Sequence, residues 1–382
     1  MGTSKINILF LADPNSIHDI KWISYFEENT DFGTFILSRK VHYNNEVLKN
    51  DDFKLQKTIP VGSIEDFSVV RFYRTIFSAI KLKRLIRKYK INLVHILYAE
   101  PNALWCNFRD YLGVPMIITC RGTDVLITIP EAFKKKSLVN YLVAPAYRMA
   151  FKKADWVSGT SLSQLKSIEN FSHRSNNLSV IRTGVDIELI QRNTDTYFPL
   201  NDSQPFILFP RYIKPVYNHE LALRAISLLP LPLKNNYKFV FVGKDSGDND
   251  YQRKLEDIIK NLGEVKIEFI RKQTQKALFE LYKKASLVIM VPKSDGSPVS
   301  AMEALICESK LILGPLEYDA DIFSDNVIKM ETWEPQELME KITNMLQTSF
   351  KPLPERVKLL IDRKTNMDNV TTIYNSFAEK RS

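Results

Sequence analysis

The segment "SDGSPVSAMEAL" (residues 294–305) places two carboxylates around a glycine, a serine and a proline, shortly after the apolar run "ASLVIMVP". We predict a helix here, with Ser297 as its N-cap and Pro298 as its first residue. The start of a helix offers unpaired N–H groups and a positive dipole end, which favour an anion such as phosphate. Gly296 has no Cβ, so the backbone can approach a ligand closely at this point.

The two carboxylates suit sugar hydroxyls better than phosphate. Asp295 would repel a phosphate, but it can accept hydrogen bonds from two neighbouring hydroxyls. Glu303 lies about 7.5 Å along the helix from Pro298, at about 1.5 Å per residue, where it could reach a second diol such as a nucleotide ribose. The alternative is that Glu303 is a solvated helix residue and Asp295 a helix cap.

The elements around this segment predict two domains with parallel sheets. A chain of 382 residues allows two domains at about 150 residues each. Short apolar runs alternate with amphipathic helices, which indicates sheets buried on both faces. The polar segment 187–205 interrupts this pattern. We therefore expect an α/β protein with two doubly wound, Rossmann-like domains facing across a cleft, and functional residues just after the strands.

The alternation gives definite ranges. The predicted strands are residues 6–12, 32–38, 92–98, 115–120, 155–161, 178–184, 206–211, 238–243, 265–270, 286–292 and 310–314. The predicted helices include residues 16–29, 71–90, 218–230, 251–263 and 274–285.

The pair Asp295-x7-Glu303 resembles the E-x7-E motif of retaining GT-B glycosyltransferases of family 4, with aspartate at the first position. The resemblance implies an acceptor-side domain over residues 1–195 and a nucleotide-sugar-binding domain over residues 196–355. It also implies a helix at residues 356–382 that crosses back to the first domain. Gly296 to Val299 and Glu303 would then bind the donor.

Further segments of the second half resemble the same family. The stretch "FPRYIKPVYN" is similar to "R-x-L-x-P-x-Y-N", which implies that Arg211 neutralises the donor diphosphate. Fixed cations of this kind stabilise charge on a leaving phosphate. Tyr217 occupies the usual lysine position, so Lys214 or Lys244 would substitute. Residues 271–274, beginning with Arg271, occupy the place that holds the nucleotide base.

The first half carries weaker matches. "CRGTDVL" is similar to the family segment "HGSD", with Arg121 in place of histidine and Asp124 expected to orient the loop. Arginine stays charged and cannot accept a proton, so Arg121 would instead bind an acidic group on donor or acceptor. His18 either lines the acceptor side or caps a helix, whereas Trp22, four residues on, is expected in the core. Gly184 is expected to have a positive φ angle.

Composition limits the partners. The formal charge of +9 and pI near 9.1 favour an anionic partner. Nucleic acid is set aside because no recognition module is present. The basic runs at residues 81–90 and 133–137 would face an anionic membrane or be merely solvated. Without a membrane span or signal peptide, we expect a cytoplasmic protein, with peripheral contact at the inner face of the cell membrane as one option.

Other chemistries are set aside. Cys106, Cys120 and Cys307 are too few and scattered for disulfides or zinc and should be core residues. The D-x-D tripeptides at residues 248–250 and 319–321 are of a kind common by chance, so we expect no catalytic metal and no cofactor beyond the nucleotide sugar.

The resemblance therefore implies a retaining glycosyltransferase that moves a sugar from a nucleotide-diphosphate sugar, with UDP the expected nucleotide. The expected acceptor is a glycan or lipid-linked intermediate of bacterial surface polysaccharide or glycolipid synthesis. Two alternatives remain open at this stage. One is an isomerase of the same fold, similar to nucleotide-sugar 2-epimerases, and the other is a non-catalytic sugar-nucleotide binder.

Overall fold

The computed structural model describes residues 5–40, 55–135, 137–192, 198–200, 204–244, 249–295 and 298–379. The chain divides into two compact units. Unit 1 comprises Met1–Thr183 and Thr365–Ser382, and unit 2 comprises Gly184–Lys364. The division thus falls ahead of the boundary at residue 195 that the sequence suggested. Residues 356–364, expected to be part of the returning helix, lie in unit 2.

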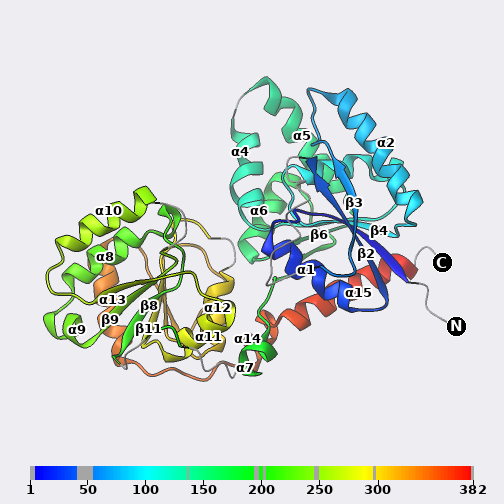
Figure 1. Cartoon of the computed structure of the whole chain (residues 1–382). Helices are drawn as coiled ribbons and strands as arrows, with labels where there is room; N and C mark the ends of the chain where they lie inside the picture. Colours follow the sequence, from blue (N-terminus) through cyan, green and yellow to red (C-terminus); the bar gives the residue numbers. More distant parts are fainter. Residues whose placement is uncertain are drawn as a thin grey trace. The chain divides into compact units, whose positions relative to one another are not determined.

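A seven-stranded parallel sheet forms the centre of unit 1 (Figure 1), in the order β3-β2-β1-β4-β5-β6-β7. Its central strands are apolar and buried, because helices cover both faces. The chain order reverses between β1 and β4, which is where open sheets of this type bind ligands. The strands are β1 (Ile6–Leu11), β2 (Phe32–Arg39), β3 (Ile59–Ile64), β4 (Leu93–Ile96), β5 (Met116–Thr119), β6 (Trp156–Gly159) and β7 (Leu178–Val180).

The helices of unit 1 bury apolar side chains in two core layers, one on each face of the sheet. One layer contains Leu82 and Phe151, and the other contains Trp22, Phe26 and Tyr374. The helical elements are α1 (Ile17–Glu28), α2 (Phe72–Lys88), η3 (Asn102–Phe108), α3 (Arg109–Leu112), η4 (Asp124–Thr128), α4 (Ile129–Lys134), α5 (Leu138–Lys153), α6 (Leu162–Ser172) and α15 (Arg363–Glu379).

The C-terminal helix α15 is part of the unit 1 core (Figure 1). Its Tyr374 hydroxyl hydrogen-bonds to Nδ1 of His95 in β4, and Nε2 of His95 lies 2.8 Å from Thr119 Oγ1 in β5. Burial lowers the pKa of His95 to about 3, so the ring is neutral at physiological pH. This polar chain joins the last helix of the protein to two central strands.

Unit 2 contains a six-stranded parallel sheet in the order β10-β9-β8-β11-β12-β13, again with core clusters on both faces. Both units are therefore Rossmann-like. The strands are β8 (Phe206–Phe209), β9 (Lys238–Val242), β10 (Ile267–Ile270), β11 (Leu287–Met290), β12 (Leu311–Leu313) and β13 (Val327–Lys329). The helical elements are α7 (Ile187–Arg192), η5 (Pro215–Tyr217), α8 (His219–Leu228), α9 (Leu231–Asn236), α10 (Asn249–Lys260), α11 (Gln275–Lys284), α12 (Val299–Ile306), α13 (Pro335–Gln347) and α14 (Glu355–Ile361).

Each of the eleven predicted strands coincides with an observed one, whereas β3 and β13 were not predicted. β3 is an edge strand interrupted by Pro60 and by Gly62, whose φ is +110°, so it lacks the continuous apolar pattern. Helix α7 occupies the start of the polar segment 187–205. Trp22 and the three cysteines are buried, as predicted. Gly184 has φ of +71°, also as predicted.

Candidate active site

Parallel pairing of β8 with β11 brings two oppositely charged side chains of unit 2 together. Arg211 follows β8, and Asp295 follows β11, so both lie at the carboxyl edge of the sheet. Arg211 Nη2 is 3.5 Å from Asp295 Oδ2, and the two side chains are only 20% and 11% exposed. The sequence indicated Arg211 and Asp295 as site residues from two separate segments, and the fold places them in contact.

Arg211 is held from two further sides. Its Nη1 donates to Ser300 Oγ at 3.4 Å, and its guanidinium carbon lies 4.4 Å from the ring centroid of Tyr217. Burial works against the charged form, but Asp295 and Tyr217 outweigh it and raise the pKa of Arg211. Tyr217, at the position where the family usually has lysine, thus supplies an aromatic face that packs against the Arg211 guanidinium, and it does not supply a second positive charge.

Helix α12 begins one residue later than predicted. Pro298 is its cap residue and not its first helical residue, because its ψ of 84° is not helical, and it makes no side-chain cap hydrogen bond. Val299, the first helical residue, packs partly buried against the core. Gly296 and Ser297, expected to bind the donor, lie outside the described residues, as does the predicted capping by Ser297.

Glu303 is buried, with 7% of its surface exposed, so the interpretation as a solvated helix residue is wrong. Its carboxylate accepts a hydrogen bond from Gln275 Nε2 at 2.8 Å. Gln275 is the first residue of α11, whose cap Thr274 ends the loop proposed to hold the base. The second carboxylate of the motif is therefore anchored beside that loop.

The other predicted cations are exposed. Lys214 follows β8, Lys244 follows β9 and Arg271 follows β10, so all three lie at the same edge of the sheet. The backbone N–H of Lys244 donates to Ile270 O at 3.0 Å, which links the loops after β9 and β10. Among the predicted cations, Arg211 is in contact with Asp295.

Tyr318 is a residue that sequence reasoning missed. It follows β12, the strand next to β11, and its hydroxyl is buried with no hydrogen-bond partner among the residues that the structure describes. Burial, together with the charge of Asp295, raises the pKa of Tyr318 well above the ordinary value. The only signal in the sequence was its position after a strand. Ser300 and Gln275, which contact Arg211 and Glu303, were missed in the same way.

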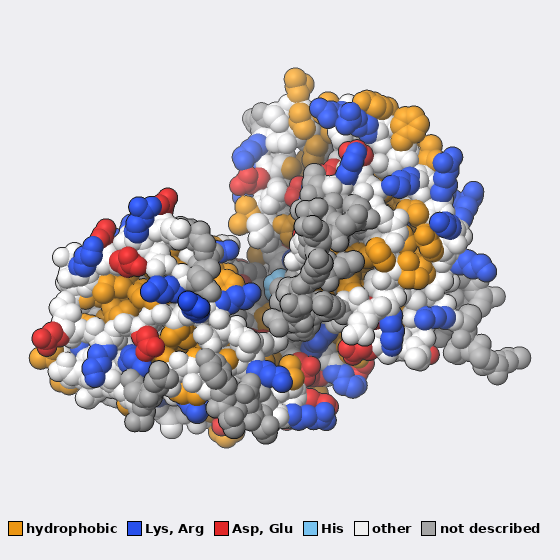
Figure 2. Space-filling view, in the orientation of Figure 1, with side chains coloured by type: hydrophobic (Ala, Val, Ile, Leu, Met, Phe, Trp, Pro, Cys, Tyr) orange, Lys and Arg blue, Asp and Glu red, His pale blue; other side chains and the backbone are white. Residues whose placement is uncertain are grey.

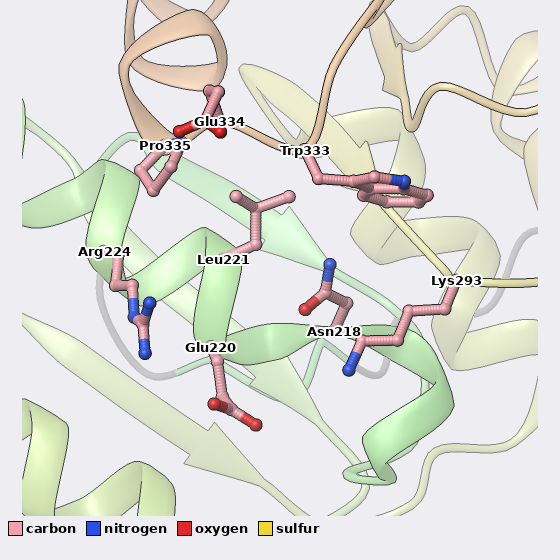
Figure 3. A pocket seen from close by; sticks show the side chains of 8 residues that line it. All are labelled: Asn218, Glu220, Leu221, Arg224, Lys293, Trp333, Glu334 and Pro335. Atoms are coloured by element: carbon pink, nitrogen blue, oxygen red, sulfur yellow. The ribbon is translucent and has the colours of Figure 1, made fainter.

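A cavity of about 580 Å³ opens beside this edge (Figure 3). It is walled by the start of α8, the start of α13 and Lys293, whose backbone N–H donates to Val216 O at 2.8 Å. The indole of Trp333 packs on Gly314, where an added Cβ would lie 3.1 Å from the ring. Tyr217, which packs on Arg211, directly precedes the lining residue Asn218. The cavity and the Arg211 pair therefore share the loop after β8.

In unit 1, the Arg121 side chain connects several segments of the chain through its contacts. It is 12% exposed and lies 3.2 Å from Asp19 Oδ1 through Nη2. Its Nη1 donates to Thr183 Oγ1 at 3.0 Å and its Nε to Leu97 O at 3.1 Å, and the guanidinium lies 5.1 Å from the Trp22 ring. Each guanidinium nitrogen thus has a partner within unit 1, and these contacts fix the orientation of the group.

Asp124 fixes the loop that carries Arg121. Its buried carboxylate accepts from the backbone N–H groups of Ala99, Gly122 and Val125 at 2.9 to 3.0 Å. Burial nevertheless raises the pKa of Asp124. His18 lies exposed in the first turn of α1, whose N-cap is Ser16.

Comparisons with known proteins identify the family to which the chain belongs. Residues 191–359 match the family "Glycosyl transferases group 1", and residues 7–161 match "Glycosyl transferase 4-like". The chain belongs to the group 1 glycosyltransferases. It is accordingly an enzyme of the family 4, GT-B type that transfers a sugar from a nucleotide sugar.

Relatives of this glycosyltransferase span most of its length. A Campylobacter jejuni α-1,4-N-acetyl-D-galactosaminyltransferase, named for a diphosphoundecaprenol-linked glycan, is 26% identical over 67% of this chain and 66% of its own. A Rickettsia africae glycosyltransferase structure has a TM-score of 0.73 at 16% identity, covering 98% of both chains. Anabaena HepE with UDP and glucose has a TM-score of 0.65 at 16% identity, covering 98% and 99%.

The described residues bear on the expectations about metals and membranes. They contain no group of three or more His, Cys, Asp or Glu side chains placed to hold a metal ion. They also contain no helix that is long and apolar enough to cross a bilayer. Within the D-x-D tripeptide at 248–250, Asp248 lies outside the described residues.

Proposed function

We propose that this glycosyltransferase acts with retention at the anomeric carbon and transfers from a UDP-sugar to a hydroxyl of a lipid-linked or surface glycan. The observation that supports it best is the contact between Arg211 and Asp295 at the ends of two adjacent strands. A cation for the diphosphate and a carboxylate for sugar hydroxyls then lie side by side, and the cation can stabilise the charge that develops on the leaving phosphate.

Each residue has a distinct role in this proposal. The donor diphosphate competes for Arg211, and the Asp295 carboxylate becomes available to sugar hydroxyls. As the sugar–phosphate bond breaks, negative charge builds on the leaving phosphate, and Arg211, with Lys214 as a second cation, stabilises it. Glu303 accepts hydrogen bonds from the ribose, and the loop from Arg271 holds the base. Lys244, Gly296, Ser297, Pro298 and Val299 complete the donor contacts.

The relatives motivate the choice of donor and acceptor. HepE was crystallised with UDP and glucose, and the Campylobacter enzyme is named for a diphosphoundecaprenol-linked acceptor. In unit 1, the loop held by Asp124, together with Arg121 and the exposed His18, would line the acceptor side. No cofactor and no metal is required, since the chain's own cations meet the charge of the leaving group.

The test is incubation with a panel of UDP-, GDP- and ADP-sugars, with and without a diphosphoundecaprenol-linked glycan. The proposal expects UDP release that depends on the acceptor, and a product whose anomeric configuration, read by NMR, equals that of the donor. A product of opposite configuration contradicts retention. A changed sugar still attached to its nucleotide would indicate an epimerase, and binding without turnover a non-catalytic protein.

A further inference from the structure

The outer surface of unit 1 has an unusual composition along two helices. The segments 67–99 and 132–154 contain no Asp or Glu and hold 14 of the 53 Lys and Arg residues of the chain. The rest of the chain therefore carries 39 basic and 44 acidic residues. The net positive charge of the protein is concentrated in these two segments, which form α2 and α5 and their surroundings.

Helix α2 buries one face and exposes an aromatic and basic one. Its buried residues include Ala79 and Leu82. On the other face, Phe77 is 69% and Tyr73 is 59% exposed, and exposed Lys and Arg side chains follow toward the carboxyl end. In Figure 2, hydrophobic and Lys or Arg side chains mingle over this part of unit 1. Within the described part of the chain, no cation of α2 forms an ion pair.

The amino end of α5 has the same character. Leu138 is 89% and Tyr141 is 69% exposed, and they follow the lysine run after Phe133. Large apolar side chains exposed to this degree, in a group, mark an interaction surface. A soluble face with no partner would be expected to carry acids and small polar residues among its cations.

The exposed apolar side chains of α2 and those at the amino end of α5 lie on one side of unit 1. The element η3 contacts both helices: Phe108 stacks on Phe72 of α2 at 6.4 Å, and Asn107 Nδ2 donates to Ala146 O of α5 at 3.1 Å. Helix α2 begins after β3 ends, and α5 runs back toward the start of β6. The amino ends of both helices therefore point toward the carboxyl edge of the sheet, the edge where open sheets bind ligands.

We propose that the exposed faces of α2 and α5 form a docking surface for an anionic lipid bilayer. Exposed aromatic and aliphatic side chains would enter the headgroup region, while Lys and Arg side chains would meet lipid phosphates. Charge complementarity selects this occupant, because pairing with a second copy of the same surface would oppose cations to cations. This inference goes beyond the proposed function and does not depend on the identity of donor or acceptor.

Vesicle flotation at low and high salt tests this. The protein should bind phosphatidylcholine vesicles containing about 30% phosphatidylglycerol, and bind pure phosphatidylcholine vesicles at least about tenfold more weakly. The double variant Arg84→Glu/Lys88→Glu should bind the anionic vesicles at least about tenfold more weakly than the native chain. Tyr73→Ser/Phe77→Ser, which keeps every charge, should also weaken binding.

The matched control is Arg253→Glu/Lys260→Glu on the exposed face of α10 in unit 2, which changes the net charge by the same amount. It should bind like the native chain. The proposal is overturned if the native chain fails to bind anionic vesicles at low salt, or if both charge variants bind equally well. Self-association that Tyr73→Ser/Phe77→Ser abolishes, seen by light scattering, would assign the surface to a second copy instead.

Discussion

At the scale of single residues, Arg211 is the side chain whose loss should affect chemistry most. If it stabilises the leaving diphosphate, Arg211→Ala should lower kcat by about 10² to 10³, because that charge is met mainly in the transition state. Arg211→Lys should recover part of this loss, since it keeps the charge but not the planar contact with Tyr217. Arg253→Ala, in an exposed ion pair, is the control. An unchanged kcat in Arg211→Ala would remove Arg211 from the mechanism.

A substitution at Tyr318 should affect donor kinetics without lowering the stability of the protein. The Tyr318 hydroxyl has no hydrogen-bond partner within the described part of the chain, so Tyr318→Phe should leave the melting temperature unchanged or slightly higher. If the hydroxyl donates to the bound donor, kcat/KM for the donor should fall by about tenfold, the cost of about one hydrogen bond. Donor kinetics and thermal melting on the same preparation check both expectations. Lower stability with unaltered kinetics would assign the hydroxyl a structural role.

The buried pair of Asp19 and Arg121 should make unit 1 sensitive to pH. Burial raises the pKa of Asp19 to about 6 from 3.8, although Arg121 opposes this. Because the folded state holds the proton more tightly, this contribution to stability is complete below pH 3.8 and is lost as pH rises to 6. The loss amounts to about 3 kcal/mol, from about 1.4 kcal/mol per pKa unit.

The comparison with Asp19→Asn isolates this effect. Between pH 3.8 and 6, the free energy of unfolding of the native chain should fall relative to that of the variant, and above pH 6 the difference should stay constant. Urea titrations followed by tryptophan fluorescence measure it, since Trp22 contacts Arg121. Asp250→Asn, on the exposed side of α10, is the matched control. A difference that does not vary with pH would contradict the pKa assignment.

Residues were predictable where a local pattern fixed them. Asp295 and Glu303 have seven residues between them in one loop and helix, and Arg211 stands at the end of a predicted strand, so local pattern indicated all three. Arg121 differs, because its partners Asp19 and Thr183 are far away in sequence and no local pattern links them. Its internal role followed only from the fold. Tyr318 was missed because an orphan hydroxyl is a property of packing, not of sequence.

At the scale of elements, the attachment of α15 rests on a buried polar contact. Tyr374→Phe removes the partner of His95 Nδ1 and leaves that nitrogen unsatisfied in the core, at a cost of about 1–3 kcal/mol. Urea unfolding followed by tryptophan fluorescence should show a lower midpoint with an unchanged slope. Thr372→Ala, an exposed change on the same helix, should cost much less. Equal midpoints for Tyr374→Phe and the native chain would show that the contact contributes nothing.

Elements were predictable according to burial. Every strand that reads as a continuous apolar run was found, because central parallel strands are covered on both faces. The short edge strands β3 and β13 are partly exposed and carry no such run, so tertiary pairing and not local pattern decides them. The start of α12 shifted by one residue because Pro298 adopts a non-helical ψ of 84°, which the sequence alone could not exclude.

At the scale of the whole molecule, two separate cores imply that a nucleotide should not stabilise both units equally. The groups proposed to hold the donor all lie in unit 2, whereas Trp22, Trp105 and Trp156 lie in unit 1 and only Trp333 lies in unit 2. A ligand at 100 times its Kd stabilises the folded state that binds it by about 2.7 kcal/mol. In calorimetry, UDP should therefore raise the midpoint temperature of one unfolding transition more than that of the other. In Trp333→Phe, tryptophan fluorescence reports unit 1 alone and should follow the transition that moves less. If UDP instead shifts the fluorescence transition of this variant as far as the larger calorimetric shift, either unit 1 binds nucleotide or the two units unfold as one. The assignment of the donor groups to unit 2 alone would then no longer account for the stabilisation.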